Sequence, residues 1–128
     1  MQSAAVNGNP EKLVSRTRRF AVTVVRFYIG LPRSGEYFVL GRQLLRSGTS
    51  VGAHYREASR AKSNADFISK MEGALQELEE TAYWLEVLVE AGLANNDGLK
   101  PLMAETNELT AIFVTAVKRV KAAQARTA

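Results

Sequence analysis

Three groups of residues are of the types that carry chemistry, and the first is a row of glutamates. Glu72, Glu79 and Glu86 follow one another at seven-residue intervals. Inward-facing glutamates hold metal pairs in some helix bundles, but those sites add Glu-x-x-His motifs on facing helices. The chain has one histidine and no cysteine. We therefore predict no metal site and no cofactor, and interpret the row as a solvated or salt-bridged acidic face.

The single histidine, His54, is the second candidate. Glu57 and Ser50 stand about one helical turn from it. General acid–base catalysis needs a partner within hydrogen-bond reach of the transferred proton, and no serine–carboxylate motif accompanies this residue. The surrounding RSGTSVGAH lies inside a helical pattern, whereas phosphate-binding glycine loops lie between a strand and a helix. We predict that His54 makes a polar contact or lies in an interface, and that the protein is not an enzyme.

Basic residues form the third group. Lys12, Arg19 and Arg26 recur every seven residues, a spacing that keeps them on one side of a helix. Such a stripe is either solvated charge or a contact for nucleic-acid phosphates, and aromatic residues that could stack on bases do not alternate with it. The candidate nucleic-acid contacts are Lys12, Arg19, Arg26, Arg42, Arg46, Lys118 and Arg119.

The charges are segregated along the chain, although the net charge is only +4. Residues 1–62 hold 11 Lys and Arg against 3 Asp and Glu, residues 63–108 hold 2 against 10, and residues 109–128 hold 4 against none. Oppositely charged neighbours that pair within the fold would explain this pattern. The alternative is a basic outer face that attracts a polyanion.

The elements that must position these residues are helices, because apolar residues recur at three- and four-residue steps and no segment alternates like a strand. We expect helices from Pro10, from about 36 to 59, from a capping box at Ser63 to about Ala91, and from Pro101 to about 123. Short connections predict an all-α, antiparallel up-down-up-down four-helix bundle. Its domain spans 10–124 and follows a disordered tail, 1–9.

Two features of the expected helices call for contacts. Gly41, Gly48 and Gly52 share one face, and each glycine costs a helix roughly 1 kcal/mol relative to alanine. Close approach of a neighbouring helix would offset that cost. In the third helix, a second apolar patch lies away from the core seam. We predict that it is an oligomer interface; the alternative is a wide contact with the core. Its residues are Tyr83, Trp84, Val87 and Ala91.

The length and composition limit the classes to which the protein can belong. The 128 residues suit one domain, and the absence of cysteine excludes disulfides. The N-terminal residues lack the order of a signal peptide, and no apolar run approaches the roughly 20 residues of a membrane span. We expect a cytoplasmic protein with no membrane contact.

Residues 43–88 resemble the 23S rRNA intervening-sequence protein family. The matching segments are QLLRSGTSVGAHYREA at 43–58, DFI at 66–68, ALQELEET at 74–81 and YWLE at 83–86. The resemblance extends over roughly 15–122. It implies a cytosolic four-helix-bundle subunit. Relatives assemble as ring-like homopentamers, so the resemblance also implies this assembly. Some relatives are encoded within rRNA genes, and a structurally similar accessory protein binds nucleic acid and a reverse transcriptase. His54 departs from the asparagine that is usual at its position.

These observations lead to three hypotheses of function. The leading one is a non-enzymatic, self-assembling scaffold or adaptor, with a homopentamer as the favoured assembly. The second is a sequence-independent RNA- or DNA-binding protein that uses a basic outer face. The third is a protein partner or regulator of a neighbouring gene product.

Overall fold

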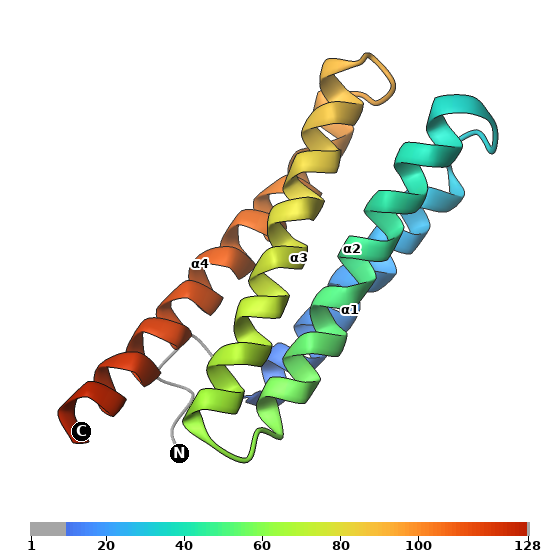
Figure 1. The fold of residues 1–128 in the computed structure, drawn as a ribbon. Coiled ribbons are helices and arrows are strands. Elements are labelled where there is room, and N and C mark those ends of the chain that lie inside the picture. The colour runs from blue at the N-terminus through green and yellow to red at the C-terminus, as the bar shows by residue number, and fades with distance from the viewer. Residues whose placement is uncertain (1–9, 128) are drawn as a thin grey trace.

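The computed structural model describes residues 10–127, and within that range the chain is all-α (Figure 1). Its helices are α1 (Pro10–Ile29), α2 (Gly35–Ser59), α3 (Asn64–Glu90) and α4 (Asn96–Thr127). Short loops join them, so that successive helices run in opposite directions and form the predicted four-helix bundle. The predicted tail, 1–9, lies outside the described residues.

Side-chain and glycine caps set the limits of α3. Ser63 Oγ accepts a hydrogen bond from the Asp66 amide at 3.0 Å, and the Asp66 carboxylate accepts one from the Lys62 amide at 3.3 Å. These bonds satisfy amides that the first helical turn leaves without partners. At the other end Gly92 takes a φ of 76°, which a glycine adopts without steric cost. Both predicted ends of the helix are confirmed.

The start of α4 was predicted wrongly. The helix begins at Asn96, five residues before Pro101, because Asn95 Oδ1 accepts a hydrogen bond from the Asp97 amide at 2.8 Å. Asn95 therefore caps a helix where the polar run suggested a turn. Pro101 stands in the second turn and removes one main-chain hydrogen bond. The helix also continues to Thr127, beyond the expected end near 123.

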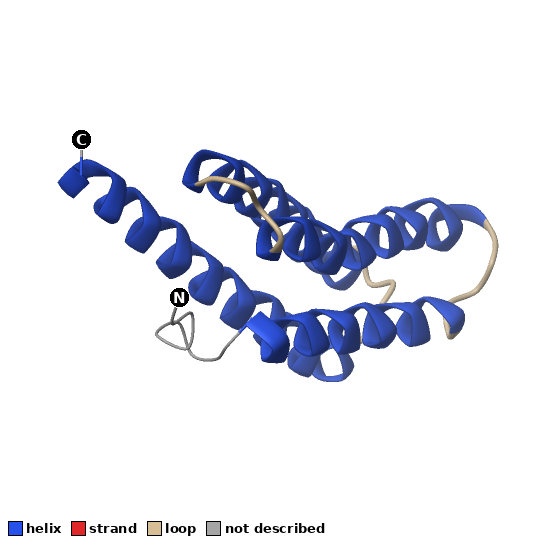
Figure 2. Cartoon of the chain, turned by 90° about the horizontal axis from the view of Figure 1, so that it is seen from below, coloured by secondary structure: helices blue, strands red, loops and turns tan. Residues whose placement is uncertain are grey.

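The helices pack as consecutive pairs, and α1 makes little contact with α4. An ion pair joins these two helices: Arg16 Nε lies 2.7 Å from one oxygen of Glu105, and Arg16 Nη2 lies 2.8 Å from the other. Glu108 approaches the same guanidinium at 3.1 Å. Hydrogen bonding to Glu105 raises the pKa of Arg16 further above its ordinary value. Figure 2 shows the C-terminal end of α4 projecting beyond the rest of the bundle.

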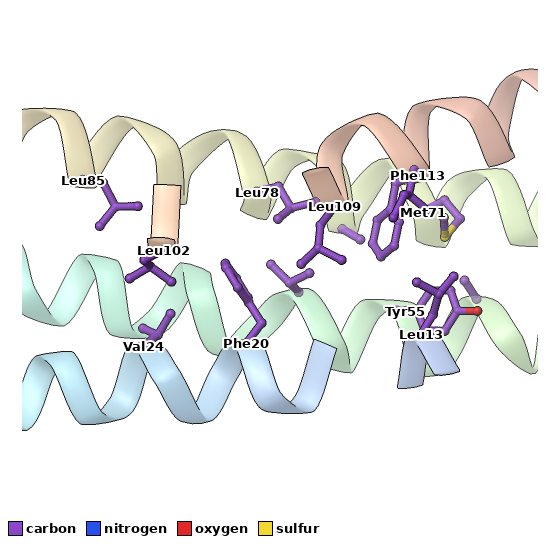
Figure 3. Close-up of a cluster of buried hydrophobic side chains, with 14 of the residues drawn as sticks. Leu13, Phe20, Val24, Tyr55, Met71, Leu78, Leu85, Leu102, Leu109 and Phe113 are labelled. Atoms are coloured by element: carbon purple, nitrogen blue, oxygen red, sulfur yellow. The ribbon is translucent and has the colours of Figure 1, made fainter. Parts of the chain in front are cut away.

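The core is a continuous apolar cluster drawn from all four helices (Figure 3). The Tyr55 ring of α2 stacks on the Phe113 ring of α4 with centroids 5.4 Å apart. Buried hydroxyls bond within the bundle: Thr81 Oγ1 lies 2.9 Å from Ser47 Oγ and joins α3 to α2. A satisfied buried polar pair of this kind costs little and fixes the relative position of two helices.

The predicted close approach to the glycines of α2 is confirmed, and α1 is the helix that makes it. A Cβ atom added at Gly48 would stand 2.7 Å from Val24 Cγ2. At Gly41 it would stand 3.1 Å from Leu31 Cδ1, and at Gly52 3.2 Å from Thr17 Oγ1. The glycines thus let α1 lie close against α2.

Tyr55 makes the bundle sensitive to alkali. Burial raises the pKa of Tyr55 to about 12, against about 10 in the unfolded chain. The unfolded state therefore ionises first, so the stability present below pH 10 is lost as the pH rises from 10 towards 12. We therefore expect the free energy of unfolding of the parent, relative to that of Tyr55→Phe, to fall by roughly 2 kcal/mol between pH 8 and 11.5. Urea unfolding at both pH values measures this difference, and a pH-independent difference would contradict it.

Candidate interaction surfaces

Some of the oppositely charged side chains form ion pairs between helices. Arg46 of α2 binds Glu77 of α3 at 3.2 Å and also forms an ion pair with Glu80. Lys121 of α4 lies 3.2 Å from Glu72 of α3. Together with the pairing of Arg16, these contacts confirm that oppositely charged neighbours account for part of the pattern. Arg46, a predicted nucleic-acid contact, already binds two carboxylates within the chain.

His54 lies in the α2–α3 contact, between two glutamates. Its Nδ1 is 3.8 Å from Glu57 and its Nε2 is 3.7 Å from Glu77. The ring covers Gly73, where an added Cβ would lie 3.0 Å from Nδ1. The hydroxyl of Ser50, the other residue one turn from His54, donates to the main-chain oxygen of Arg46 at 2.7 Å. The arrangement is a polar contact between helices, as predicted.

A metal site was not expected. Among the residues that the structure describes, no three His, Cys, Asp or Glu side chains gather closely enough to hold an ion. The predicted glutamate row instead lies on the outside of α3, where Glu72, Glu79 and Glu86 are all exposed.

The structure distributes the predicted nucleic-acid contacts over three helices. Lys12, Arg19 and Arg26 are exposed along one side of α1. This side adjoins α4, since Arg16 on the preceding turn binds Glu105. Three further predicted contacts are exposed elsewhere: Arg42 on α2, with its guanidinium 5.2 Å from the Phe38 ring centre, and Lys118 and Arg119 on α4.

The predicted apolar patch on α3 is narrower than expected. Tyr83 and Ala91 are exposed, and Val87 is partly exposed. Trp84 is also partly exposed, but it packs against the core, with its ring edge-on to Tyr83 at 4.9 Å between centroids. Its indole N–H is buried and has no hydrogen-bond partner among the described residues. Trp84 therefore contributes to folding, which was the alternative to an interface.

Exposed apolar residues on α1 and α2 were missed by the sequence reasoning. The exposed fractions are 43% for Val22, 57% for Ile29, 40% for Phe38 and 60% for Val39. They are comparable to the 56% of Tyr83 in the predicted α3 patch. The sequence signal that could have identified the α1 and α2 residues is the presence of apolar residues on the side of each helix that is otherwise polar. The α1 residues form part of a row at steps of four, three and four: Arg18, Val22, Val25 and Ile29.

Two surfaces follow from this placement. The first, the α1–α2 outer surface, consists of Arg18, Val22, Ile29, Phe38, Arg42 and Arg56, all exposed. The α2 members lie beside its glycine face, because Phe38 precedes Gly41 by three residues and Arg56 follows Gly52 by four. The second, the α3 outer row, steps by four and three residues through Glu72, Gln76, Glu79, Tyr83, Glu86 and Glu90.

None of the described helices combines the length and apolar character needed to cross a membrane.

Comparison with known proteins identifies relatives of this fold. Residues 11–115 match the family described as 23S rRNA-intervening sequence protein. The chain is also similar to a solved structure from Bacteroides thetaiotaomicron VPI-5482, described as a protein with unknown function from the S23 ribosomal protein family. The two are 35% identical with a TM-score of 0.78, over 92% of this chain and 99% of the other. No curated protein matches the sequence.

Proposed function

The chain belongs to the 23S rRNA-intervening sequence protein family, and from this premise we propose that it is a non-enzymatic, self-assembling scaffold or adaptor. The observation that carries the proposal is the set of large apolar side chains on the outside of the bundle, Tyr83 above all. Tyrosine is a frequent anchor of protein interfaces, and contact between copies would remove these side chains from water.

The non-enzymatic part of the proposal rests on the contacts of the polar groups. His54 lies between two glutamates and covers a glycine. Ser47 and Thr81 bond each other inside the bundle. These side chains are used to hold α2 and α3 together. A homopentamer is the assembly that we favour, because it is the form implied by the resemblance of residues 43–88 to the family.

Light scattering tests the self-assembly. The parent is expected to have a mass several times the 14.0 kDa of one chain. Tyr83→Glu places a charge at an exposed apolar position and should reduce the mass towards that of a monomer with unchanged helix content. Trp84→Glu is a poorer test, because Trp84 packs against the core.

The matched control is Thr115→Glu, which adds the same charge to an exposed position on α4 and should leave the assembly intact. A parent that scatters as a monomer contradicts the proposal. A Tyr83→Glu variant that stays assembled would show that Tyr83 does not lie in the interface.

A second candidate function is sequence-independent binding of RNA or DNA. Arg19 and Arg26 favour it, because both are exposed on one side of α1 and have no ion pair within the described part of the chain. Side chains in this state are available to phosphates, whose contacts carry no sequence information.

A further inference from the structure

Charges on the two defined surfaces are left unpaired by the fold. Arg18, Arg42 and Arg56 on the α1–α2 outer surface form no ion pair among the described residues, and the Arg42 guanidinium lies over the Phe38 ring. On the α3 outer row, Glu79 and Glu86 likewise lack a cationic partner in the described range. Each chain therefore displays a basic surface and an acidic row that do not neutralise each other.

The two surfaces lie on different sides of the bundle. On α3, Glu77 and Thr81 bind residues of α2, whereas Glu72 of the outer row pairs with Lys121 of α4. The row therefore faces outward on the α3–α4 side. The α1–α2 outer surface lies beside the contact between the first two helices, away from α3. The acidic row of one chain cannot reach its own basic surface.

Both surfaces also carry exposed apolar side chains beside their charges. Tyr83 stands between Glu79 and Glu86 in the α3 outer row. On the other surface, Ile29 and Phe38 lie towards the α1–α2 loop, and Val22 lies further back along α1. Apolar side chains bordered by polar residues are usual in protein interfaces. The opposite charges of the two surfaces then favour contact between unlike surfaces.

We propose that the α1–α2 outer surface of one copy docks on the α3 outer row of the next copy, so that the subunits join head to tail. This inference rests on the proposed self-assembly and names the surfaces that form it. Contact between two α1–α2 surfaces, or between two α3 rows, would bring like charges together and is disfavoured. The interface is therefore heterologous, the kind that closes into a ring or grows into a filament.

A charge exchange tests this pairing. Arg42→Glu/Arg56→Glu makes the α1–α2 surface acidic, and Glu79→Arg/Glu86→Arg makes the α3 row basic. Each double variant should associate on the order of 100-fold more weakly than the parent, because like charges then oppose each other. Combining all four substitutions in one chain restores opposite charges and should restore the assembly. Sedimentation or light scattering over a concentration series measures each case.

The matched control is Arg19→Glu/Arg26→Glu, an equal change of charge on the side of α1 that adjoins α4, which should leave assembly unchanged. All substituted residues are exposed, and circular dichroism checks that helix content is retained. Double variants that assemble like the parent overturn the pairing but leave self-assembly standing. Failure of the quadruple variant to assemble also overturns it. A monomeric parent overturns both proposals.

Discussion

Gly48→Leu is expected to destabilise the bundle by about 3 kcal/mol or more, because overpacking of a filled core forces side chains and backbone to move. Even a single methyl group would force a shift, since a Cβ at this position would lie 2.7 Å from Val24 Cγ2 and 2.9 Å from Cγ1. Val24 is fully buried, so its side chain cannot turn out into solvent. The whole of α1 must move away from α2 to admit a leucine.

A graded series separates this steric effect from helix propensity. Gly48→Ala gains roughly 1 kcal/mol of helix propensity, yet it should still destabilise the protein because of the same contact. The matched control is Gly98→Ala in α4, where an added Cβ meets nothing within 4 Å. That variant should be as stable as the parent or slightly more stable.

Thermal and urea unfolding measure the series. Alanine and leucine at position 48 should lower stability progressively, while Gly98→Ala should not. A Gly48→Leu protein that unfolds at the temperature of the parent would show that α1 does not lie on this face of α2.

The sequence was sufficient to predict the fold because its local and long-range signals agree. Ser63 and Asp66 form the capping bonds that their spacing predicted, and Gly41, Gly48 and Gly52 face a neighbouring helix as the cost of glycine required. The start of α4 was missed because asparagine and glycine favour both turns and helix caps. The main-chain hydrogen bond from the Leu99 amide to the Asn95 carbonyl, at 3.2 Å, is what shows that a helix begins here.

The surfaces were harder to predict than the helices. Trp84 lies outside the apolar seam in sequence, but its large ring reaches back to the core, an outcome that depends on side-chain conformation. The sequence analysis singled out neither Val22 nor Ile29, because a single apolar residue on a polar side carries little information. Their significance appears only when the packing of α1 on α2 places them on one outer surface with Phe38 and Arg42.

The salt dependence of nucleic-acid binding is the second large effect that we expect. Five candidate contacts lie on α1 and α4: Lys12, Arg19, Arg26, Lys118 and Arg119. If all five contact phosphates, the logarithm of the binding constant should fall with the logarithm of salt with a slope of about −4.5 for a duplex. Affinity would then drop roughly 500-fold between about 50 and 200 mM salt. Duplexes of unrelated sequence should bind alike, because phosphate contacts do not read bases.

Arg19→Glu/Arg26→Glu removes two of these contacts and should reduce the steepness of the slope by about 1.8 or more. The matched control is Arg60→Glu/Lys62→Glu, which reverses two exposed charges in the α2–α3 connection and should keep the slope of the parent. Fluorescence anisotropy with labelled duplexes over a salt series measures both. Because phosphate contacts are strongest at low salt, a parent that binds no duplex at about 50 mM salt would exclude this function. Equal slopes for the two variants would show that α1 is not the binding side.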